Sequence, residues 1–117
     1  MLAERAAEFF TPGVSSPFML FATQVRQEKR SLVPAIIHVD GSARPQTVTR
    51  DQNRGLYDLL SSFMRLTGIP VLLNTSFNAA GEPIACTPED ALKTFLAIGL
   101  DMLVIGNYLI RRRGGGV

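Results

Sequence analysis

Apolar side chains recur at helical spacing in three stretches of the chain, which predicts three helices. A Thr-Pro-Gly sequence ends the first, and Gly68 ends the second, for which Asp51 or Thr49 could serve as the N-cap. The third begins with threonine, proline and two acidic residues, a strong signal for a capped helix start. The three predicted helices are 2–10, 51–67 and 87–98.

Shorter apolar runs between these helices predict strands. A polar Asp-Gly-Ser sequence at 40–42 separates two of the runs, which is typical of a hairpin, and residues 27–32 are polar enough to form an exposed loop. The apolar run before Asn74 is typical of a strand buried on both faces. The predicted strands are 18–26, 35–39, 43–49 and 69–73, followed by one last strand or a pair of strands at 102–105 and 108–110.

This order of helices and strands predicts a mixed α/β fold, with one sheet that holds both antiparallel and parallel neighbours. At 117 residues there is room for one core, so we expect a single domain over residues 1–110. Three arginines, three glycines and a valine follow at 111–117, and this composition is typical of a disordered tail.

Composition narrows the function classes. The formal net charge of +2 comes from the arginines of that tail, so the folded body lacks the basic surface that nucleic-acid binding needs. No apolar stretch reaches the roughly 20 residues that a membrane-spanning helix requires. The single cysteine, Cys86, cannot form an internal disulfide, which favours a cytoplasmic protein. Its position before a helix suggests an activated thiol, but we expect a small, partly buried apolar residue instead.

The most informative polar segment is Asn74-Thr75-Ser76-Phe77-Asn78, which directly follows an apolar run. In an extended backbone its two asparagines and its serine would share one side. Amides and hydroxyls at the end of a central strand suit a phosphate or a small amide. A polar loop whose side chains cap their own backbone explains the same residues equally well.

A second segment runs from His38 to Arg44. A three-residue loop at 40–42 would place His38 opposite Arg44, whereas a two-residue loop would not. Arg44 could bind a phosphate or carboxylate through two hydrogen bonds, or it could face solvent on an edge strand beside Pro45. His38 has no partner for a general-base role, and a hydrogen-bonded strand histidine is the better interpretation. One histidine and one cysteine do not make a zinc site, so we expect no metal site within the chain.

Several motifs in order resemble the C-terminal, YrdC-like domain of the nodulation protein U and cephalosporin O-carbamoyltransferase family. The resemblance extends from about Leu2 to Ile110. It implies a twisted mixed sheet with packed helices, present here as a partial domain. The motifs that carry it are His38 to Val48, Thr67 to Asn78, Gly81 to Ile84 and Thr87 to Ala91.

The resemblance implies that this domain uses ATP to convert the carbamoyl group of carbamoyl phosphate to carbamoyl-adenylate. A separate actin-like, metal-bearing domain then transfers that group to a hydroxyl acceptor. Mg²⁺ would accompany the ATP phosphates. Arg44 would be the catalytic phosphate ligand, and the polar segment at 74–78 would supply neutral donors to phosphate, ribose or the carbamoyl amide. The predicted binding residues are Arg44, Asn74, Thr75, Ser76, Asn78 and His38.

Two departures from the family pattern bear on activity. A basic motif that precedes the matching segment in the family is not in this sequence, and neither is the actin-like domain. We therefore expect a fragment or a split subunit that is inactive alone and needs the actin-like domain or a separate subunit. The alternative is a non-catalytic remnant or assembly module, a homo-oligomer without a ligand of its own.

Overall fold

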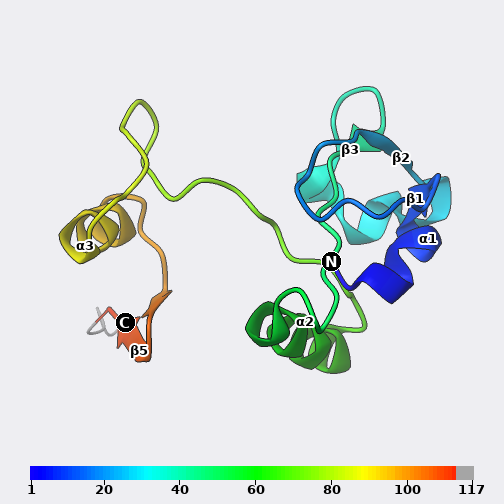
Figure 1. Cartoon of the computed structure of the whole chain (residues 1–117). Helices are drawn as coiled ribbons and strands as arrows, with labels where there is room; N and C mark the ends of the chain where they lie inside the picture. Colours follow the sequence, from blue (N-terminus) through cyan, green and yellow to red (C-terminus); the bar gives the residue numbers. More distant parts are fainter. Residues whose placement is uncertain (113–117) are drawn as a thin grey trace. The chain divides into compact units, whose positions relative to one another are not determined.

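The computed structural model describes residues 1–112, which form two compact units. The first unit comprises Met1–Leu73, and the second begins at Asn74. Figure 1 draws both units.

The first unit opens with a 3₁₀ helix, Ala3–Arg5, that continues into α1, Ala6–Phe9, so the predicted first helix is confirmed. Three short strands follow and lie together in Figure 1 beside α1. They form an antiparallel sheet in the order β1-β2-β3, in which Phe10 pairs with Val25 and Thr23 with Ala43. The strands are β1 (Phe10–Thr11), β2 (Thr23–Val25) and β3 (Ser42–Ala43).

The strands predicted for this unit are wrong over most of their length, because the observed strands are much shorter or absent. In place of the strands predicted at 18–26 and 43–49, the structure has only the short strands β2 and β3. The predicted loop at 27–32 is a 3₁₀ helix, Gln27–Leu32. The predicted strand at 35–39 is replaced by a further 3₁₀ helix, Pro34–Ile36. Proline lacks the N–H that a sheet ladder needs and its fixed φ suits a helix start, which explains this replacement.

Helix α2, Arg54–Thr67, confirms the second predicted helix but begins later than expected. Asn53, rather than Asp51 or Thr49, is the N-cap, and its side chain accepts a hydrogen bond from the N–H of Leu56 at 3.0 Å. Gly68 ends the helix in the left-handed conformation with φ 76°, as its place in the sequence predicts.

Two small apolar clusters hold the first unit together. The first cluster includes Phe9, Phe10 and Val25. In the second cluster, Leu60 of α2 packs against Leu2 and Val48. Residues 69–73, predicted as a strand, form no strand with any other described residue. The carbonyl of Pro70 nevertheless accepts a hydrogen bond from the N–H of Leu2 at 3.3 Å.

The second unit contains α3, Pro88–Ala97, and a hairpin of β4, Met102–Ile105, with β5, Tyr108–Arg111, as predicted. Thr87 and Asp90 form a capping box at the start of α3, and these hydrogen bonds lower the pKa of the Asp90 carboxyl. Phe95 and Leu103 centre its core. Arg111 is the last residue of β5, and residues 113–117 of the predicted tail lie outside the described part.

The mixed α/β class is therefore confirmed, but the expected single sheet is not formed. Residues 1–112 hold two small antiparallel sheets, and parallel pairing is limited to an isolated bridge between Leu2 and Val48. Within these residues, every helix is too short or too polar to cross a lipid bilayer.

Candidate functional site

A tight turn at residues 38–42 precedes Arg44. The N–H of His38 donates to the carbonyl of Ser42 at 2.8 Å, and the N–H of Gly41 donates to the carbonyl of His38 at 2.9 Å. Gly41 has φ 82°, a conformation that favours glycine. His38 Nδ1 also lies 3.0 Å from Ser42 Oγ. His38 therefore pairs with Ser42 across a loop of residues 39–41, and the loop at 40–42 that would place His38 opposite Arg44 is not formed.

Asp40 stabilises this turn. Its carboxylate accepts the N–H of Ser42 at 2.9 Å. The Ser42 hydroxyl, the Ser42 N–H and the nearby His38 hold the pKa of Asp40 below its ordinary value. The Ser42 hydroxyl has one proton to donate. When it donates that proton to Asp40, the contact between Ser42 and His38 requires His38 Nδ1–H to donate to Ser42 Oγ. The turn is thus fixed by hydrogen bonds on both sides of a buried serine.

Arg30, a residue that our sequence analysis did not single out, contacts the same turn. Its Nε donates to the carbonyl of Val25 at 3.2 Å, and Val25 N–H in turn donates to the carbonyl of Gly41 at 3.0 Å. A methyl group added at Gly41 would overlap the guanidinium of Arg30, which shows how closely the two lie. Nothing in a polar loop sequence indicates such a contact, because it depends on the pairing of β2 with the turn.

Arg44 directly follows β3, the edge strand of the sheet, and its side chain is exposed. Residues 1–112 provide it with no hydrogen bond and no ion pair. Its neighbours on both sides, Ala43 and Pro45, are buried. The backbone at Arg44 is therefore anchored while its guanidinium is available to an anion.

The polar segment at 74–78 belongs to the second unit. Asn74, Thr75 and Ser76 are exposed, and Asn78 is half-buried. The amide nitrogen of Asn78 donates to the carbonyls of Ala79 and Glu82, each at 3.1 Å. Asn78 therefore closes a local turn, as the interpretation of a self-capping loop predicts. Asn74, Thr75 and Ser76 form no strand, and their predicted ligand roles stay predictions.

Cys86 is exposed, so the expectation of a partly buried residue is wrong. Its Sγ contacts the carbonyl of Ile84 at 3.3 Å, and its N–H donates to the Asp90 carboxylate at 3.3 Å. Among residues 1–112, no three histidine, cysteine, aspartate or glutamate side chains gather closely enough to hold a metal ion.

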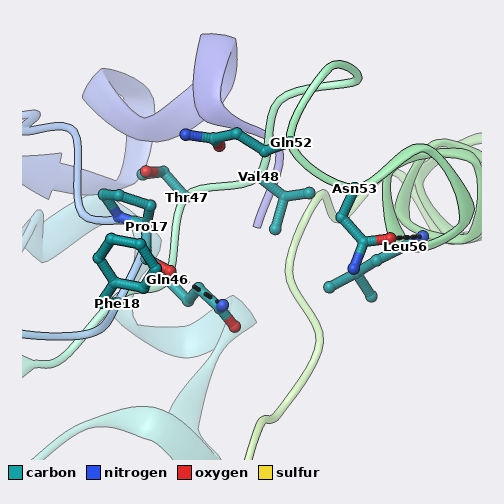
Figure 2. A pocket seen from close by; sticks show the side chains of 8 residues that line it. All are labelled: Pro17, Phe18, Gln46, Thr47, Val48, Gln52, Asn53 and Leu56. Carbon is teal, nitrogen blue, oxygen red and sulfur yellow. Dashed lines mark hydrogen bonds between the residues drawn. The ribbon is translucent and has the colours of Figure 1, made fainter.

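The first unit also contains a pocket of about 320 Å³ (Figure 2). In that view, Pro17 and Phe18 lie on one side, Asn53 and Leu56 lie on the other, and Val48 lies between them. Three segments that are separate in the sequence meet here, so no local sequence pattern indicates the pocket. Its lining residues are Pro17, Phe18, Gln46, Thr47, Val48, Gln52, Asn53 and Leu56.

Hydrogen bonds fix the walls of this pocket. Thr47 exchanges hydrogen bonds with Ser16, through its Oγ1 at 2.8 Å and its N–H at 2.9 Å. Gln46 Nε2 donates to the carbonyl of Pro17 at 3.0 Å. On the opposite wall, Gln52 Oε1 accepts the N–H of Thr49 at 3.2 Å. The lining is therefore held in place by the backbone of the unit and contains no charged side chain.

Comparison with known proteins identifies the class. A family model described as carbamoyltransferase C-terminus matches residues 1–112. The chain belongs to the carbamoyltransferase C-terminal family. The resemblance found in the sequence motifs is thereby confirmed.

Particular relatives support the same assignment. Nodulation protein NolNO of Sinorhizobium fredii is 48% identical over 116 residues, which cover 97% of this chain and 17% of the relative. Nodulation protein NolO of Bradyrhizobium diazoefficiens is 47% identical over 115 residues, covering 96% and 21%. Nodulation protein U of Rhizobium tropici is 45% identical over 81 residues, covering 69% and 14%. The chain thus spans about a fifth or less of these relatives.

Proposed function

We propose that this chain is the part of an O-carbamoyltransferase that binds ATP and carbamoyl phosphate and takes part in forming carbamoyl-adenylate. The observation that carries the proposal is the family match over residues 1–112, which includes the segment from His38 to Val48. Transfer of the carbamoyl group to a hydroxyl acceptor would need the actin-like domain, or a separate subunit that supplies it.

Arg44 is the residue that we propose to hold a phosphate. ATP and carbamoyl phosphate are both polyanions, so bringing them together requires a fixed positive charge. The exposed Arg44 guanidinium has no acidic partner in the described part of the chain, and its backbone follows an anchored turn. A planar guanidinium can donate two parallel hydrogen bonds to phosphate.

The remaining predicted ligands would act as neutral donors. Asn74, Thr75 and Ser76 are exposed and can reach a phosphate, a ribose or a carbamoyl amide without adding charge. His38 and Asn78 are already engaged in turns, at Ser42 and at Ala79 to Glu82, so we propose positioning roles for them. The described residues do not form a carboxylate cluster that fits Mg²⁺, and we assign none of them to it.

Calorimetric titration of ATP, and separately of carbamoyl phosphate, tests the role of Arg44. Arg44→Ala should weaken binding of both anions by roughly tenfold, the usual loss for one charge-assisted contact. Arg65→Ala is the matched control. Arg65 is also exposed, and this substitution removes the same charge from the same unit. Equal affinities for the two variants would refute the assignment of Arg44.

A non-catalytic assembly module is the second candidate, and one observation favours it. Phe18, Leu20 and Phe21 are 77%, 75% and 54% exposed in a segment without secondary structure. Consecutive exposed apolar side chains are typical of a surface that a partner covers. Light scattering tests this candidate: a dimer that Leu20→Ser converts to a monomer would support it, and a monomer at high concentration would contradict it.

A further inference from the structure

The pocket in the first unit has a chemistry that differs from that of Arg44. Its lining includes no charged side chain, so it offers no opposite charge to a phosphate or a carboxylate. Val48 and Leu56 provide apolar surface, and three carboxamides supply polar atoms. Its volume of about 320 Å³ is at the lower end of the range for ligand pockets, which suits one ring system better than a whole nucleotide.

The polar atoms that the pocket can offer are mainly donors. Asn53 Oδ1 is occupied by the N–H of Leu56, and Gln52 Oε1 is occupied by the N–H of Thr49. These bonds also fix which end of each amide is nitrogen. Within residues 1–112, Asn53 Nδ2 and Gln52 Nε2 have no hydrogen-bond partner. A ligand edge rich in acceptors would satisfy both nitrogens.

The aromatic side chain at the pocket supplies a stacking surface. Phe18 lines the pocket and is nonetheless 77% exposed, so a face of its ring is open to a ligand (Figure 2). Pro17 lies beside it. Stacking on an aromatic ring favours a flat, heteroaromatic ligand and does not require charge.

From these features we infer that the pocket lined by Phe18, Gln52 and Asn53 binds a nucleobase, an uncharged planar ring with acceptor nitrogens at its edge. This inference rests on the proposed function for the choice of a purine, because the nucleotide proposed to bind the chain is ATP. Phe18 stacks on the base, Asn53 and Gln52 donate to its ring nitrogens, and Val48 and Leu56 contact its remaining edge.

Adenosine, which has the base but no phosphate, is the probe that separates this site from Arg44. Titration of adenosine into the ¹⁵N-labelled chain should shift the amide signals of residues 18, 47, 48, 52 and 53, and ribose alone should not. Phe18→Ala should weaken adenosine binding by roughly tenfold, as loss of base stacking does. Phe21→Ala is the control, since Phe21 is also exposed but does not line the pocket.

Asn53→Asp provides a second test that does not depend on the aromatic ring. Aspartate is as good an N-cap as asparagine, so α2 keeps its start and its stability. The substitution replaces the amide donor by an acceptor and should abolish adenosine binding. Retained binding in this variant would contradict the donor role, and equal binding by the Phe18 and Phe21 variants would overturn the pocket assignment.

The two proposals can fail separately. If Arg44→Ala weakens ATP but adenosine causes no shifts at residues 46–53, the pocket assignment fails and the proposed function stands. If adenosine binds as described but Arg44→Ala leaves ATP affinity unchanged, the base site stands and the proposed phosphate ligand is wrong.

Discussion

Leu60 is the residue through which α2 is fixed to the rest of the first unit, so its truncation should cost much of that unit's stability. Its side chain is 1% exposed and packs against Leu2 and Val48. Leu60→Ala removes three carbons, and at about 0.8 kcal/mol per buried methylene the lost transfer energy is about 2.4 kcal/mol. A residual cavity adds to this, so we expect a loss of about 3 kcal/mol in the free energy of unfolding.

The adjacent Leu59 offers the matched control, because it lies on the same helix and is 56% exposed. Leu59→Ala should change stability by less than about 0.5 kcal/mol. Urea unfolding should be followed by tyrosine fluorescence in a Tyr108→Phe background, which leaves Tyr57 on α2 as the single tyrosine in a chain without tryptophan. Equal losses for Leu59→Ala and Leu60→Ala would show that α2 does not pack as described.

Three further predictions concern local structure, two in the first unit and one in the second. Gly68→Ala should cost roughly 1–2 kcal/mol for its left-handed backbone alone, since nothing lies near the added methyl group. Gly41→Ala should cost about 1 kcal/mol more, because it displaces Arg30 from the Val25 carbonyl, and an Arg30→Ala background should remove that difference. In the second unit, the pKa of Asp90 is lowered by Thr87, so the stability this carboxylate provides is present above pH 4 and is lost as pH falls through the lowered pKa. Carboxyl NMR titration should show that pKa rising towards its ordinary value in Thr87→Ala, and an unchanged Asp90 titration would contradict the capping box.

The helices could be predicted from the sequence because their signals are local. The apolar stripe before Gly68 and the capping sequence at Thr87 each lie within one or two turns of the element that they specify. The apolar runs of β4 and β5 are local signals too, although the sequence left open whether they form one strand or the pair that the structure shows. The N-cap of α2 was misplaced because Thr49, Asp51 and Asn53 all have suitable side chains, and only the backbone conformation selects Asn53.

The strands of the first unit could not be predicted in this way, because their partners are distant in sequence. Residues 43–49 are apolar enough for a strand, yet only Ser42–Ala43 pairs with β2. Pro34 diverts the preceding run into a 3₁₀ helix. The candidate site shows the same limit: Arg44 is a prediction from its motif, whereas Arg30 and the pocket beside Phe18 depend on contacts between separate segments.

The central proposal is that this chain binds ATP through Arg44. Titration of ATP into the ¹⁵N-labelled chain, recorded by NMR for the wild type and for Arg44→Ala, tests it most directly. Amide signals of residues 43 and 44 should shift and saturate in the wild type, at an ATP concentration that rises about tenfold in the variant. Shifts confined to the arginines at 111–113, or identical titrations of the two proteins, would contradict the claim.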